Sequence, residues 1–196
     1  AGHVSPDLDY VATSSLALNS GTIKDAALNA ATLTLASPGA TNSLGANKAI
    51  VIDGVLPTIT AVSTTKSDGS YTTGEVIPIT ATFSEVVNVT GTPKITLETG
   101  DTDAVVNYTS GSESNTLTFN YTVEAGHTST DLDLSNSNTL ILSSGTIKDT
   151  AGNNLSTSIS EITSTISTNS NIIIDTTVPT VSSVNSTKAN GSYKQG

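Results

Sequence analysis

The sequence contains no cysteine, tryptophan or methionine, and all seven of its basic residues are lysine. Without cysteine, disulfides and zinc-thiolate sites are excluded. Aromatic residues make up only 4% of the chain, so a core has to be built from Val, Ile, Leu and Ala, which suits a thin sandwich. The lack of Arg beside abundant Ser and Thr favours strands and turns over solvated helices. We therefore expect an all-β protein.

Positive charge is also scarce, with 7 basic residues against 17 acidic ones and a net charge of −10. Such a surface repels nucleic acid and anionic membranes and attracts cations. No apolar run reaches the roughly 18 residues of a membrane-spanning helix. We expect no nucleic-acid partner and no membrane insertion. If the protein works outside the cell without disulfides, a bound metal ion is one candidate source of stability.

Motifs of common enzyme classes are missing: there is no serine elbow, phosphate loop or HExxH. His3 and His127 each lie in a polar Ala-Gly-His segment without a second histidine, which favours a surface turn over metal binding or base catalysis. Asp131 and Asp133 share one face of a strand and suit a cation better than a glycosidic bond. We expect no enzymatic activity and no catalytic residue.

The chain repeats itself. Ser20-Gly21-Thr22-Ile23-Lys24-Asp25 recurs 124 residues later at 144–149, and Asp68-Gly69-Ser70-Tyr71 recurs as Asn-Gly-Ser-Tyr 122 residues later at 190–193. A two-residue deletion separates the two offsets. The self-similarity predicts the C-terminal half of one repeat at 1–56, a complete repeat at 57–178 and the start of a third at 179–196.

Short β-branched runs broken by turn residues predict the strands of the complete repeat. The clearest is 116–123, where Leu117, Phe119, Tyr121 and Val123 share one face. Other strands are predicted at 58–64, 76–83, 94–98, 104–109, 132–134, 139–142, 158–166 and 171–174. Seven or eight strands in about 120 residues are typical of an Ig-like β-sandwich.

Several segments, in this order and spacing, are similar to the bacterial Ig-like (cadherin-like) tandem repeats of large surface or secreted adhesins: 74–79, 83–85, 95–100, 131–133, 147–153 and 174–179. The resemblance implies an extended string of sandwiches, commonly stiffened by calcium, that holds a binding domain away from the cell. It implies an extracellular or cell-surface location, with neighbouring repeats of the same protein as partners. One departure is Ala27-Leu28-Asn29, where the family has Ala-Gly-Asn; it puts in doubt the turn of the first repeat and any ligand supplied by it.

The acidic residues are the one group of side chains that suggests a functional site. The predicted strand directions place them at the two ends of the sandwich. The end joined to the preceding repeat receives Asp53, Glu85, Asp149 and Asn153, and the opposite end receives Asp131, Asp133 and Asp175, with first-repeat counterparts Asp7 and Asp9. Clustered oxygen ligands at a domain junction are what Ca²⁺ requires. The alternative is that these side chains close turns or are solvated.

Three functions remain open. The leading hypothesis is a structural or adhesive spacer of a repetitive surface or secreted protein. The second is a subunit of a self-assembling extracellular filament or matrix, in which other copies complete the half repeat. The third is a carbohydrate-binding module, which the scarcity of aromatic residues disfavours.

Overall fold

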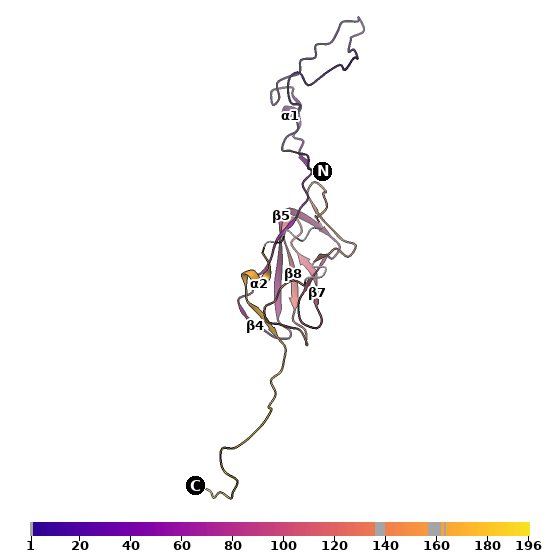
Figure 1. Ribbon diagram of the computed structural model, residues 1–196. Helices are drawn as coiled ribbons and strands as arrows, with labels where there is room; N and C mark the ends of the chain where they lie inside the picture. The colour runs from indigo at the N-terminus through magenta and orange to yellow at the C-terminus, as the bar shows by residue number, and fades with distance from the viewer. Residues whose placement is uncertain (1, 136–139, 157–161, 163) are drawn as a thin grey trace.

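The structure is a computed structural model, and it describes residues 2–135, 140–156, 162 and 164–196. A central body, residues 57–178, lies between an N-terminal segment that extends from one end and a C-terminal segment that extends from the other (Figure 1). In the described residues the body contains one helix, the four-residue α2 (Ile166–Asn169), and is otherwise built from strands. The expected all-β class is confirmed.

Two sheets form the body. The larger runs in the order β10 (Leu140–Ile141), β6 (Lys94–Leu97), β7 (Ala104–Ser110), β8 (Ser114–Thr122), β5 (Val76–Thr90) and β11 (Thr146–Asp149), with β3 (Ile59–Thr64) also paired to β5. The smaller sheet has the order β4 (Gly69–Tyr71), β12 (Ile172–Asp175) and β9 (Thr128–Ser129). The β4–β12 pair is parallel, and the other pairs are antiparallel.

The core lies between these sheets and follows the alternation seen in the sequence. Along β8, Leu117, Phe119 and Tyr121 are almost fully buried, and Val123 follows them just beyond the strand. The other core residues come from the neighbouring strand β5, from β6 and from β12 of the smaller sheet, and they include Ile77, Ile79, Leu97, Ile172 and Ile174. Because one face of each central strand is apolar, the register of these strands is strongly specified.

The N-terminal segment has little core of its own, since Ser43 is the one buried residue in 2–56. Its elements are β1 (Val4–Ser5), α1 (Leu44–Asn47) and β2 (Ile52–Asp53). They nevertheless copy part of the body: β1 pairs with β2 in the register of β9 with β12, and α1 lies 122 residues before α2. The sequence repeat therefore extends to local backbone structure.

Three strand predictions need correction. Residues 132–134 contribute only an isolated bridge, Leu134 to Leu97, and not a strand. The predicted strand at 158–166 falls largely outside the described residues, and its last residue, Ile166, begins α2. Residues 146–149 form β11, a strand that the sequence did not predict, because they pair with the far end of β5.

Candidate metal centre

Three carboxylates meet where the N-terminal segment joins the body. Asp53, Glu85 and Asp149 each offer an oxygen, and these oxygens all lie within 4.8 Å of one another. Asp53 ends β2, Glu85 lies within β5 and Asp149 ends β11. Residues far apart in the sequence thus form one group that could hold a metal ion. We call these three residues the acidic triad.

Glu85 reaches the triad through an irregularity in β5. The sequence predicted a strand end at residue 83, but β5 continues to Thr90. Its pairing with β8 shifts register between Thr82 and Val87. A register shift bends a strand and redirects its side chains, and Glu85 stands in this interval, half-buried. Beyond it β5 pairs with β11, which carries Asp149.

Asn153 fixes the carboxylate of Asp149. The Asn153 backbone N–H donates to Asp149 Oδ1 at 2.8 Å, and its side-chain amide donates to Oδ2 at 2.7 Å. Asp149 is only 2% exposed, so these bonds replace the water that its charge has lost. Each carboxylate oxygen keeps lone-pair capacity for a further partner.

The same asparagine ties the linker to the body. Its second amide hydrogen goes to the backbone carbonyl of Asp53 at 2.9 Å. Asp53 itself closes a turn, because its Oδ1 accepts the N–H of Val55 at 3.0 Å. The sequence named Asn153 as a ligand; the structure shows it positioning Asp149 and Asp53 with its amide nitrogen.

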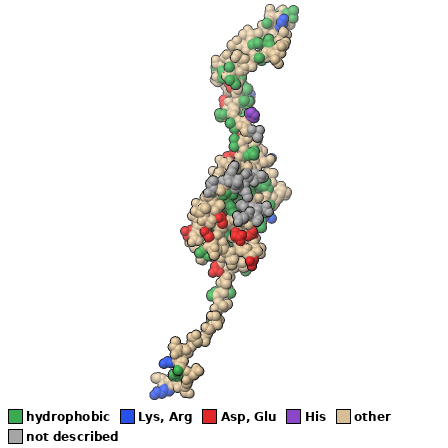
Figure 2. All heavy atoms as spheres, viewed as in Figure 1, with side chains coloured by type: hydrophobic (Ala, Val, Ile, Leu, Met, Phe, Trp, Pro, Cys, Tyr) green, Lys and Arg blue, Asp and Glu red, His purple; other side chains and the backbone are tan. Residues whose placement is uncertain are grey.

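The triad consists of three carboxylates and contains no basic group. Figure 2 shows Asp and Glu side chains on the central body, with Lys side chains at its edge and at the far ends of both flanking segments. Partial burial, together with the charges of Asp149 and Asp53, raises the pKa of the Glu85 carboxyl. A cation at this position would relieve the repulsion.

Removing the Glu85 charge should stabilise the metal-free protein at neutral pH. The pKa of Glu85 is raised in the folded state, so protonation of Glu85 stabilises the folded protein. This stabilisation is fully present below the ordinary pKa of a glutamate and is lost as pH rises through the folded-state pKa. In chelator, Glu85→Gln should therefore melt at a higher temperature than wild type near about pH 7 and level with it near about pH 4. Glu113→Gln, at an exposed loop carboxylate, should match wild type throughout. A Glu85→Gln difference independent of pH would contradict the electrostatic account.

The predicted cluster at the opposite end does not come together as a second triad. Asp133 is engaged with α2: it accepts from Thr165 Oγ1 at 2.8 Å, from the Ile166 N–H at 3.2 Å and from Ser167 Oγ. The bond from Ile166 gives the first N–H group of α2 an acceptor. Asp131 and Asp175 are exposed, and in the described part of the chain no further group of three metal-ligating side chains is found.

The first-repeat counterparts behave in the same way. Asp9 accepts the N–H groups of Tyr10 and Gly39, both at 2.9 Å, whereas Asp7 is exposed. These hydrogen bonds lower the pKa of Asp9 despite the opposing effect of partial burial. The structure therefore brings together Asp53, Glu85 and Asp149, as the sequence predicted, whereas the carboxylates of Asp133 and Asp9 accept hydrogen bonds from a helix start and from loop N–H groups.

The altered turn of the first repeat keeps its geometry. Leu28 takes the left-handed conformation, φ +69°, that Gly152 has at φ +94° in the complete repeat. Asp25 still accepts the N–H and the side-chain amide of Asn29, both at 2.9 Å. The turn of the first repeat therefore forms without the glycine.

Comparison with protein-family models, curated proteins and solved structures finds no match to this chain. The adhesin-repeat resemblance thus stands on the sequence segments alone. Within the residues that the structure describes, no helix is long and apolar enough to cross a membrane.

Proposed function

We propose that this chain is a spacer in a repetitive surface or secreted protein, and that Ca²⁺ at the acidic triad stiffens the joint between successive repeats. The observation that carries the proposal is the origin of the three carboxylates. One belongs to the linker and two belong to the body. An ion bound to all three fixes the direction in which the chain enters the body.

The oxygen spacing allows the three carboxylates to share one Ca²⁺ ion. Two oxygens on opposite sides of Ca²⁺ lie about 4.6–5.2 Å apart, and the triad oxygens all lie within 4.8 Å of one another. They can therefore bind the same calcium ion with little movement. Three carboxylates leave several positions of a six- to eight-oxygen shell for water or backbone carbonyls.

The flanking segments support a role within a longer string. Large apolar side chains stay exposed on both sides of the body, among them Val51, Ile52, Val178, Val181 and Val184. Neighbouring repeats would cover them in the spacer hypothesis, and other copies of the chain would cover them in a filament. The same exposed residues favour both arrangements, so molecular mass in solution separates them.

Calcium should raise the melting temperature of the full chain and reduce its conformational spread. At free calcium about 100 times the dissociation constant, the gain is about 2.7 kcal/mol. Calorimetry and small-angle scattering, each in calcium and in chelator, measure the two effects. Asp53→Ala should abolish most of both without unfolding the body, because Asp53 lies outside its core.

Asp101→Ala is the matched control, since Asp101 is exposed and lies outside the triad. It should respond to calcium as wild type does. Identical melting and scattering of wild type in calcium and in chelator would refute the stiffening role. A calcium-dependent rise in mass by light scattering would favour the filament instead.

A further inference from the structure

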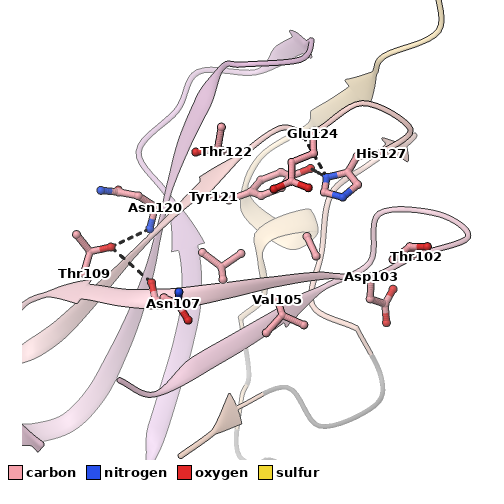
Figure 3. A pocket seen from close by; sticks show the side chains of 12 residues that line it. Thr102, Asp103, Val105, Asn107, Thr109, Asn120, Tyr121, Thr122, Glu124 and His127 are labelled. Atoms are coloured by element: carbon pink, nitrogen blue, oxygen red, sulfur yellow. Dashed lines mark hydrogen bonds between the residues drawn. The ribbon is translucent and has the colours of Figure 1, made fainter. Parts of the chain in front are cut away.

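A groove of about 380 Å³ opens between β7 and β8, away from the acidic triad. It exists because β7 changes partner along its length. Tyr108 and Ser110 pair with β8, whereas Ala104–Asn107 pair with β6 alone. The last three residues of β8, Asn120–Thr122, likewise pair with β5 alone. The two strands therefore diverge, as Figure 3 shows.

Thr109 lies at the register shift in the last part of the β7–β8 ladder, at the narrow end of the groove. Its hydroxyl accepts the backbone N–H of Asn120 at 3.3 Å and points back to the carbonyl of Asn107 at 3.5 Å (Figure 3). A side chain thus replaces the next backbone bond between the strands. The strands therefore separate at a defined side-chain contact of β7.

The groove walls are polar and carry no positive charge. Asn107, Asn120 and Thr122 expose their side chains, and Asp103 and Glu124 add carboxylates. None of the residues that line the groove is Lys. Phosphorylated, sulfated or other anionic ligands would be repelled, and a purely apolar ligand would strip water from these groups without replacing it.

The buried Tyr121 and the half-buried His127 close the wide end of the groove. Tyr121 is 1% exposed, and its hydroxyl lies 2.9 Å from His127 Nδ1, with the two rings stacked. The Glu124 N–H also donates to His127 Nδ1, at 3.3 Å. Burial, reinforced by the charge of Glu124, raises the pKa of Tyr121 to about 12 and keeps its hydroxyl a donor.

The groove therefore offers donors and acceptors side by side. Each Asn amide gives both, each carboxylate accepts, and Thr122 does either. Adjacent hydroxyls of a sugar ring need this mixture, since each hydroxyl donates once and accepts. The volume lies in the range of about 300–1,000 Å³ common for small-ligand sites.

We propose that the groove between β7 and β8 binds a short neutral saccharide. Recognition comes from the amides of Asn107 and Asn120 and the carboxylates of Asp103 and Glu124, with the half-buried His127 ring closing one end. This site goes beyond the spacer role and returns to the carbohydrate-binding alternative, with amides and carboxylates in place of the exposed aromatic side chains that are scarce in this sequence. It shares no residue with the acidic triad, so either proposal can fail alone.

The test is an NMR titration of the ¹⁵N-labelled full chain in chelator with cellobiose, maltose and lactose in turn. At least one should shift the amide signals of residues 103–107, 120–124 and 127, with a dissociation constant of ~1 mM. Asn120→Ala and Asn107→Ala should each weaken binding about three- to tenfold, the loss of one or two hydrogen bonds. Asn115→Ala, an exposed asparagine at the other end of β8, should bind as wild type does.

Glucuronate and spermidine serve as charged probes. Glucuronate should cause no shift in the groove. Binding of spermidine with no response to any of the three sugars would overturn the proposal and identify a cation site. Sugar-induced shifts outside the groove, or sugar binding unchanged in both asparagine variants, would overturn it as well. The dispersed spectrum of each variant shows at once whether it is folded.

Discussion

Replacing Phe119 by alanine should lower the free energy of unfolding of the central body by about 3–5 kcal/mol. Phe119 is fully buried at the middle of β8 and meets Tyr108 edge to face, with ring centroids 6.1 Å apart. The chain has only two Phe and no Trp, so few large side chains can fill the cavity. Natural domains are stable by about 5–15 kcal/mol, and one such change removes a large share of that.

Chemical denaturation followed by tyrosine fluorescence or circular dichroism measures this loss. Phe119→Leu, which keeps most of the volume, should cost less than about 1.5 kcal/mol. Val76→Thr, at an exposed position of β5, should stay within about 0.5 kcal/mol of wild type. A Phe119→Ala cost no larger than that of Val76→Thr would mean that β8 does not form the centre of the core.

Alternation made the central strands predictable. Leu117, Phe119 and Tyr121 recur every second residue, and this period fixes both the strand and its buried face. The length of β5 was not predictable in the same way. Glu85 and Val86 interrupt its apolar alternation, and the strand continues because residues 87–90 pair with β11 and Val87 also pairs with Ser114 of β8.

Long-range partners decide what local sequence leaves open. Thr165 and Ser167 lie in a Ser- and Thr-rich stretch that has high strand propensity, yet α2 forms there. Asp133, 33 residues earlier than Ile166, accepts the helix-start N–H and two neighbouring hydroxyls. No pattern local to either segment announces this pairing, so Asp133 was interpreted as a ligand.

The proximity of the three triad carboxylates could be predicted from the sequence, because the repeats and the strand order place them at the same end of the body. Asp53 precedes the complete repeat, and Asp149 stands in a recurring Ile-Lys-Asp segment whose turn brings back Asn153. The groove could not be predicted from the sequence, since it depends on β7 pairing with β6 up to Asn107 and with β8 only from Tyr108 onward. A change of partner within one strand has no period that the sequence displays.

Replacing Asp149 by alanine should lower the free energy of unfolding both in chelator and in calcium, for two different reasons. In chelator the variant leaves the backbone N–H and the amide of Asn153 without their acceptor beside a buried position. An unsatisfied buried donor costs about 1–3 kcal/mol, and relief of repulsion with Glu85 offsets part of this. In calcium the variant should also lose the ligand-dependent gain of about 2.7 kcal/mol at saturation.

Asp25→Ala is the internal control that the repeat provides. Asp25 makes the same bonds to Asn29 that Asp149 makes to Asn153, but on the exposed N-terminal segment and outside the triad. Its pKa is lowered by the Asn29 side chain, so its hydrogen bonds are formed with the charged carboxylate. Asp25→Ala should leave both the unfolding of the body and its calcium response unchanged within about 0.5 kcal/mol. If the two variants lost the same stability and kept the same calcium response, Asp149 would be a turn residue like Asp25, and the joint would owe its geometry to Asn153 alone.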